Sequence, residues 1–276
     1  MNVQIIGGNG MIGRTTLTAA CALGLAISGG CSSGWYGAKE RATYTLPVAA
    51  GTIESVESVV IRTRAGDVLL EPAEGEPRVI GKVRARTRER ADATTVSAEI
   101  VGDKLEISVN WPDGKRQDNE GCDLLVYVPT MNGVTIDTTA GDIFVKGMAG
   151  PLTIDSSAGD IEVHGHDGDV AVHTTAGDIR FWDVSGTADV RSTAGDIAMH
   201  GVAAPSYVRT SAGDVYIRFH EGTSATVEAS TSAGDISFNG IEIRGSSGTG
   251  TIGEGSETTS RVKTSAGDIN VLSSAG

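Results

Sequence analysis

The sequence predicts an all-β fold, a parallel β-solenoid (a β-helix-like rod) with 18-residue repeats, preceded by a small β cap. The tripeptide Ala-Gly-Asp occurs eight times, and five of its aspartates follow one another at intervals of 18 residues. Around each copy, apolar residues alternate with polar ones, which is the period of strands. Glycine accounts for 38 of the 276 residues, and this density, together with Ser, Thr and Val, disfavours helices.

Composition excludes several classes of protein. The 22 Lys and Arg residues against 35 Asp and Glu give a net charge of −13, so we expect no nucleic-acid partner. The chain has 7 prolines and no repeated Gly-X-Y triplet, which excludes collagen. Aromatic residues make up 4% of the chain, so we expect an aliphatic core.

The first element, residues 1–31, has the pattern of a secretory signal peptide. Arg14 is the only charged residue before Lys39, and it precedes a mostly apolar run over residues 15–27 that is too short to span a bilayer. The small residues before Cys31 resemble the lipobox of bacterial lipoproteins, which implies cleavage before Cys31 and acylation of its thiol. We expect an exported protein of the cell envelope, lipid-anchored at the outer membrane or cell surface.

The next elements are a tether over residues 32–52 and a β cap over residues 53–130. An early Ala-Gly-Asp turn ends at Asp67. Longer strands are predicted over residues 79–86, 95–101, 104–111 and 124–129. Cys122 alternates with apolar residues and has no partner for an intramolecular disulfide in the mature chain, so we expect a buried, inert thiol.

Basic residues alternate along one predicted strand of the cap, so their charges would share one face. Such a face is suited to an acidic envelope polymer or a lipid phosphate, and its alternative role is to protect a solvated edge strand. The candidate polyanion-binding residues are Lys82, Arg84, Arg86, Arg88 and Arg90.

The repeats occupy residues 131–276, and each repeat predicts two strands and two tight turns. Apolar residues recur six before, one after and three after each aspartate, so these rows should point inward. The Thr/Ser pair and alanine before each glycine suit a narrow corner. A Gly- and Ser-rich stretch, residues 240–257, is predicted to be a loop that leaves the solenoid between its last two rungs.

The repeated Thr-Ser-Ala-Gly-Asp-Ile-x-Val turn, the single Val128-Pro129 before it and the signal peptide together resemble a bacterial family over residues 53–276. This is the putative-adhesin domain family of unknown function, a β-strand-repeat family similar to head GIN domains. The resemblance implies export, a repetitive β-helical shape and a role in adhesion or envelope stress. It supplies no catalytic residues.

The stacked aspartates are the first candidate site. Neighbouring carboxylates on adjacent rungs repel one another, so each must be compensated. One possibility is a corner device in which each Asp accepts backbone or hydroxyl hydrogen bonds. The alternative is a calcium ladder, although calcium-binding β-rolls place glycine two residues before the aspartate. Its ligands would be Asp142, Asp160, Asp178, Asp196 and Asp214.

Aromatic and histidine side chains on the rungs are the second candidate. His164 and His200 occupy equivalent positions two repeats apart, with Trp182 between them, and are too distant to share a metal, so we interpret them as exposed surface histidines. Phe144, Trp182, Tyr207 and Tyr216 should point outward, where they are available for sugar stacking.

We therefore expect a non-enzymatic surface protein of the cell envelope that acts as an adhesin or binding scaffold and needs no cofactor. Its expected partners are the membrane, through the lipid anchor, and an envelope polysaccharide, an anionic polymer or a protein. The main alternative is a periplasmic envelope-stress sensor or scaffold. A polysaccharide-active enzyme is disfavoured because the repeated aspartates are not differentiated into acid and base.

Overall fold

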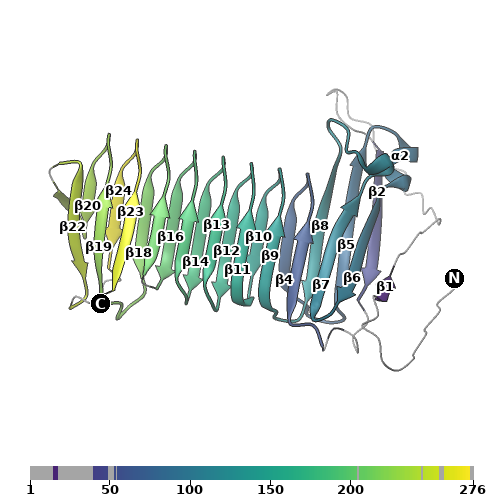
Figure 1. Ribbon diagram of the computed structural model, residues 1–276, viewed down its shortest axis with the longest axis horizontal. Helices are drawn as coiled ribbons and strands as arrows, with labels where there is room; N and C mark the ends of the chain where they lie inside the picture. Colours follow the sequence, from purple (N-terminus) through teal and green to yellow (C-terminus); the bar gives the residue numbers. More distant parts are fainter. Residues whose placement is uncertain are drawn as a thin grey trace.

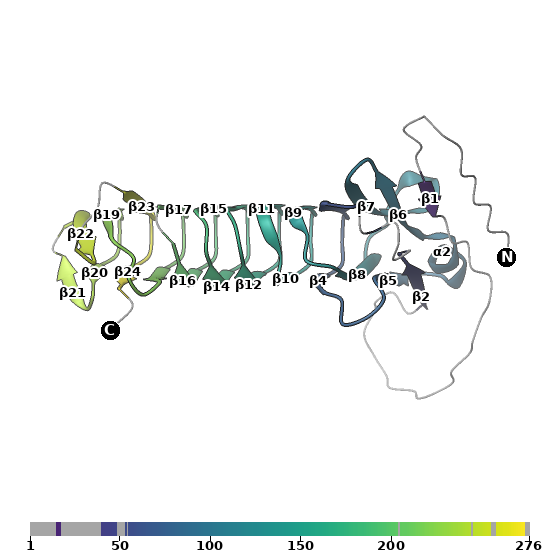
Figure 2. The ribbon, with the colours of Figure 1, turned by 90° about the horizontal axis from the view of Figure 1, so that it is seen from below.

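The protein is a rod made of two facing β-sheets, seen in two perpendicular views of the computed structural model (Figures 1 and 2). The structure describes residues 15–17, 40–48, 53, 55–203, 205–243, 245–254 and 258–273. Each sheet contains 12 strands, and we call them sheet A and sheet B. The all-β prediction is confirmed. No helix in the described residues is both long and apolar enough to span a membrane.

Five central rungs form the regular part of the rod, and each rung contributes one strand to each sheet. The strands in sheet A are β9 (Asn132–Asp137), β11 (Ala149–Asp155), β13 (Val170–His173), β15 (Ala188–Arg191) and β17 (Ser206–Arg209). The strands in sheet B are β10 (Ile143–Lys146), β12 (Ile161–His166), β14 (Ile179–Val184), β16 (Ile197–Val202) and β18 (Val215–Phe219). Neighbouring rungs pair in parallel with residues 18 apart in register, as in Ile143 with Ile161. The predicted parallel solenoid is therefore confirmed.

The core between the sheets is aliphatic. The residues one and three after each aspartate are almost fully buried, for example Ile161 and Val163, each 0% exposed. Phe181 and Phe219 are the largest fully buried side chains. Burial of a Val, Ile or Phe side chain contributes about 1.5–3 kcal/mol, so the inward rows hold the rungs together.

Glycine is required at each Ala-Gly-Asp corner because neighbouring rungs approach closely there. Gly159 has a φ of +116°, and a Cβ added to it would lie 2.2 Å from the carbonyl oxygen of Gly141. The alanines before these glycines form parallel bridges from rung to rung, such as Ala140 with Ala158. A side chain at the glycine position would separate the rungs.

The N-terminal end departs from chain order. One rung, β3 (Ser58–Arg62) with β4 (Val68–Pro72), lies between β9/β10 and a rung formed by β7 (Lys104–Asn110) with β8 (Gly121–Val128). Antiparallel strands then complete each sheet: β6 (Thr95–Val101) and β1 (Thr15–Leu17) in sheet A, and β5 (Arg78–Ala85) and β2 (Glu40–Pro47) in sheet B. Two short helical segments, α2 (Arg88–Ala93) and η1 (Pro112–Gly114), connect these strands. The four strands predicted after the first Ala-Gly-Asp turn are present.

The C-terminal end shows the same interchange. The last rung in sequence, β23 (Thr259–Lys263) with β24 (Ile269–Leu272), lies between β17/β18 and a rung formed by β19 (Ala225–Ser230) with β20 (Ile236–Phe238). Beyond that rung, β21 (Ile241–Ile243) and β22 (Ser247–Ile252) pair antiparallel with β20 and β19. The prediction of a loop over residues 240–257 is therefore wrong for these two strands, which end the rod. Gly250 fits there because a Cβ would lie 2.4 Å from the Phe238 ring.

Candidate binding face

The outward faces of the two sheets carry different side chains. On sheet A the outward row three residues before each bridging alanine is mostly charged, and it consists of Asp137, Asp155, His173, Arg191, Arg209 and Lys263. On sheet B, aromatic and histidine rings cross five adjacent strands, from β10 to β18. We call this set, Phe144, His164, Trp182, His200 and Tyr216, the ring ladder.

The rings of the ladder touch in sequence along the rod. The centroid distances are 5.0 Å from Phe144 to His164, 4.2 Å from His164 to Trp182, 5.9 Å from Trp182 to His200 and 4.9 Å from His200 to Tyr216. The two histidines stack on opposite faces of Trp182, with interplanar angles of 16° and 14°. Three of the four aromatic residues predicted to point outward therefore gather in one ladder, while Tyr207 lies on sheet A.

The histidines differ from the prediction of exposed surface groups, because both are half-buried between other rings. Burial lowers the pKa of His200, and the nearby guanidinium of Arg218 adds to this effect. The Nε2 atom of His164 lies 3.5 Å from a carboxylate oxygen of Glu162. The ladder is thus a packed surface element rather than a set of independent side chains.

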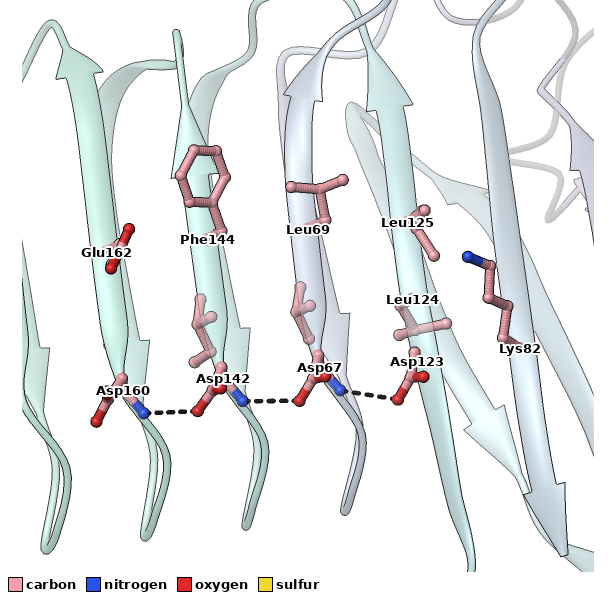
Figure 3. Close-up of a pocket in the computed structure, with 12 residues that line it drawn as sticks. Asp67, Leu69, Lys82, Asp123, Leu124, Leu125, Asp142, Phe144, Asp160 and Glu162 are labelled. Carbon is pink, nitrogen blue, oxygen red and sulfur yellow. Dashed lines mark hydrogen bonds between the residues drawn. The ribbon is translucent and has the colours of Figure 1, made fainter. Parts of the chain in front are cut away.

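The repeated aspartates form a continuous hydrogen-bonded line along one edge of sheet B. In each step the carboxylate Oδ1 of one Asp accepts the backbone N–H of the Asp on the next rung, at distances of 2.8–3.2 Å. In spatial order the line is Asp123, Asp67, Asp142, Asp160, Asp178, Asp196, Asp214, Asp268 and Asp235. Figure 3 shows the part of this line that runs from Asp123 through Asp67 and Asp142 to Asp160. We call this line the aspartate ladder.

The aspartate ladder has the geometry of the corner device. One oxygen of each carboxylate is used by the neighbouring backbone, which offsets the repulsion between adjacent charges. Arg180 adds contacts of 2.7 Å to Asp178 and 3.5 Å to Asp160. In the part of the chain that the structure describes, no group of three or more His, Cys, Asp or Glu side chains is placed to hold a metal ion.

A groove lies on the same face, between the aspartate ladder and the start of the ring ladder (Figure 3). It crosses β5, β8, β4, β10 and β12 and has a volume of about 460 Å³. Its apolar residues include Leu69, Leu125 and Phe144, and Lys82 lies at the end nearest β5. The groove combines apolar surface, acceptors and one cation.

The comparisons with known proteins agree with this architecture. The family model Toastrack DUF4097, which describes a domain of unknown function, matches residues 57–272. The chain belongs to the Toastrack DUF4097 family. The resemblance to a putative-adhesin family with a β-solenoid repeat is thereby confirmed for the fold, and no curated protein matches the chain.

Solved structures similar to this Toastrack chain are described as putative adhesins. One from Bacteroides fragilis has a TM-score of 0.52 and 14% sequence identity, with 84% of this chain and 97% of that chain covered. One from Parabacteroides distasonis has a TM-score of 0.44 and 11% identity, with 86% of this chain and 98% of that chain covered. At these identities the likeness bears on the fold.

The predicted basic stripe of this Toastrack chain is not formed by one strand. Strand β5 ends at Ala85, and α2 begins at Arg88 because the Thr87 side chain accepts the backbone N–H of Arg90 and caps the helix. The five cations therefore do not share one strand face, and that part of the prediction is wrong.

Most of these cations also have partners. Arg84 pairs with Asp123 at 2.8 Å, Arg88 with Asp92 at 2.9 Å, and Arg90 with Glu120 at 2.6 Å, and Arg86 donates to the backbone oxygen of Asp118. Lys82 has no ion pair or side-chain hydrogen bond to any described residue. Polyanion binding at these residues stays a prediction.

The two predicted cysteine roles have different outcomes. Cys122 is fully buried, and burial followed by the charge of Asp123 raises the pKa of its thiol to about 12, so it is inert at neutral pH as expected. Cys31, the predicted lipidation site, lies outside the described residues, as does most of the predicted signal peptide. The prediction of a tether over residues 32–52 is wrong for Glu40–Pro47, because this segment forms β2 and pairs with β5 in sheet B. Sequence analysis missed the stacking of His164 and His200 on Trp182 and their contacts with Phe144 and Tyr216.

Proposed function

We propose that this protein is a non-enzymatic binding protein of the cell envelope, acting as an adhesin or binding scaffold through the outer face of sheet B. The observation that carries the proposal is the gathering of the ring ladder, the aspartate ladder and the groove on one face of a rigid rod. Aromatic residues are common at recognition surfaces because they offer large contact areas at low entropic cost.

The absence of enzymatic activity is part of this proposal. General acid and base catalysis needs groups whose environments separate their pKa values. The aspartates of the ladder repeat one local geometry, since the Oδ1 of each accepts the backbone N–H of the aspartate on the next rung. Such a repeated line stabilises the edge of sheet B, and it does not provide one aspartate as general acid and another as general base.

The proposed location is the outside of the cell, with lipid attachment at Cys31. The similar structure from Bacteroides fragilis, described as a putative adhesin, supports a surface role. In the alternative, the rod remains in the periplasm as an envelope-stress sensor or scaffold, and the same face contacts a component of the envelope there.

Labelling of intact cells with a membrane-impermeant reagent tests the location. Under the adhesin proposal the protein is labelled on intact cells, and a Cys31→Ala variant is released into the medium. Labelling only after the outer membrane is opened would favour the periplasmic scaffold.

Binding of the purified protein to isolated envelopes tests the face. A Trp182→Ala/Tyr216→Ala variant should lose most of the binding, because it removes two rings of the ladder. The matched control is Tyr207→Ala, which removes an aromatic residue that is 41% exposed on the opposite sheet. Equal binding by both variants and the wild type would contradict the assignment of the face.

A further inference from the structure

The groove at the N-terminal end of the sheet B face has the composition of a sugar-binding site. Leu69 and Leu125 are adjacent in register on β4 and β8, and Phe144 pairs with Leu69 from β10. All three side chains are outward and half-buried, and they form an apolar floor across three neighbouring strands.

Phe144 offers a ring face to this groove. It is the first ring of the ladder, so only its contact with His164 involves another ring. In Figure 3 the ring is seen nearly face-on from the groove side, with Leu69 beside it on the next strand. The C–H face of a pyranose ring packs on an aromatic face of this kind, whereas the inner rings of the ladder are covered by their neighbours.

Hydrogen-bond acceptors border one side of the floor. Asp67 and Asp142 each use Oδ1 to accept the backbone N–H of the next aspartate, and their second carboxylate oxygens have no partner among the described residues. Both side chains are exposed. Free carboxylate oxygens beside an apolar floor recognise a ligand that presents hydroxyl or amide donors next to an apolar surface.

The charges around the groove select against an acidic ligand. Asp67, Asp123, Asp142, Asp160 and Glu162 all line it, and Lys82 is its one lining cation. Asp123 is neutralised by Arg84, which leaves an excess of negative charge. The Lys82 ammonium, directed toward Leu125 in Figure 3, can donate to a single hydroxyl or carbonyl oxygen of the ligand.

We propose that this groove binds an uncharged glycan segment, with a pyranose ring on Phe144, further rings over Leu69 and Leu125, and hydroxyl or acetamido N–H groups on Asp67 and Asp142. The rungs repeat at about 4.8 Å, close to the advance of one sugar ring in an extended chain, so successive rings meet successive strands. This inference rests on the proposed function, because it takes the outer face of sheet B as the binding face.

Calorimetric titration of the full-length protein tests the proposal. The probes are the β-1,4-linked tetramers of glucose and of N-acetylglucosamine, with tetragalacturonate as the acidic probe. We expect binding of at least one uncharged tetramer and weaker binding of the acidic one. Phe144→Ala should raise the Kd about tenfold, as should Phe144→Leu, which keeps an apolar side chain of similar burial but removes the ring face. Tyr207→Ala is the matched control and should leave the Kd unchanged.

Asp142→Asn tests the rim, because the asparagine oxygen still accepts the N–H of Asp160 while the negative charge is lost. It should weaken binding of the uncharged tetramer several-fold. Failure of both uncharged tetramers to bind, or equal affinity for the wild type and both folded Phe144 variants, overturns the proposal. Preferred binding of tetragalacturonate that strengthens in Asp142→Asn also overturns it and favours an anionic ligand. In either case, envelope binding that depends on Trp182 and Tyr216 would leave the proposed function standing.

Discussion

At the scale of single residues, two glycines with positive φ differ in whether a neighbouring rung also excludes a side chain. Gly177 has a φ of +120°, and a Cβ there would lie 2.1 Å from the carbonyl oxygen of Gly159 on the neighbouring rung. Gly165 has a φ of +58°, but nothing lies within 4 Å of its Cβ position. Both positions restrict the backbone, whereas only Gly177 is also limited by a neighbouring chain segment.

We expect Gly177→Ala to destabilise the protein by about 3 kcal/mol or more, because backbone strain and the overlap with Gly159 add together. Gly165→Ala should cost about 1 kcal/mol, from the left-handed backbone alone. Thermal unfolding of the two variants checks this difference. Equal losses would show that the rungs can separate at the corner without much cost.

His166 makes a different residue-scale contribution, through pH. It is 1% exposed, its Nε2 donates to the backbone oxygen of Gly150 at 2.8 Å, and its Nδ1 has no partner among the described residues. Burial lowers its pKa below the ordinary value of 6.5, an effect partly opposed by the hydrogen bond to Gly150 and by the charges of Asp167 and Asp169. The unfolded chain therefore takes up the proton at a higher pH than the folded protein.

The contribution of neutral, buried His166 to the free energy of unfolding is fully present above pH 6.5 and is lost as the pH falls through the pKa of His166 in the folded protein. In the next two rungs Val184 and Val202 occupy the same inward position. We expect His166→Val to lose less thermal stability than the wild type between about pH 7.5 and about pH 5, the range in which histidines titrate. His200 titrates in the same direction in both proteins, so the difference isolates His166. An equal loss in both proteins would contradict this assignment.

At the scale of elements, the sequence carried enough information for the rungs and the inward rows but not for their order. Ala266 bridges both Ala212 and Ala233, so the corner residues of the last rung match either neighbour. Because each rung at the C-terminal end presents the same alanine, glycine and aspartate to the next, local pattern does not distinguish chain order from the interchange seen there. The prediction of a loop over residues 240–257 was wrong because the short strands β21 and β22 complete the two sheets there, although β22 consists largely of Gly, Ser and Thr.

The candidate site was also predicted only in part, and for a geometric reason. His164, Trp182 and His200 are 18 residues apart, so the period places them in one column. Phe144 and Tyr216 lie two residues earlier in their strands and reach the histidines diagonally, as the register of Phe144 with Glu162 shows. The sequence contains a local signal for α2, namely the capping Thr87 and the helix-forming residues that follow it. The alternation of basic residues led instead to the prediction of one strand.

The interchange predicts a specific pattern of amide protection. Val262 and Val271 lie in strands paired on both sides, so their amides should exchange as slowly as those of Val208 and Ile217 in the preceding rung. The Thr249 amide should exchange much faster. Since Thr231 N–H donates to Ser246, the antiparallel alternation directs the Thr249 N–H away from β19. Hydrogen exchange monitored by NMR checks this, and fast exchange at Val262 would place the last rung at the end of the rod.

At the scale of the whole molecule, the central rungs form a one-dimensional array in which each rung pairs with its two neighbours. The two ends are closed by antiparallel strands and by α2 at the N-terminal side, and the repeated part between them sets the length of the rod (Figure 1). The length of the binding face is therefore set by the number of rungs. The number of central rungs can therefore change without any change in the strands that close the two ends.

Duplication of residues 179–196 tests this view of the rod. The added segment is one full period with its own Ala-Gly-Asp corner, so its strands fit the register of β14 and β16 on both sides and add a second tryptophan to the ring ladder. We expect a folded protein with thermal stability equal to or above that of the wild type and a maximum dimension longer by about 4.8 Å, measured by small-angle X-ray scattering. Duplication of residues 179–187 alone is the matched control. Half a period moves each following strand to the opposite sheet and separates the corner glycines from their partners, so this variant should fail to fold. Equal behaviour of the two insertions would contradict the conclusion that the 18-residue register governs assembly of the rod.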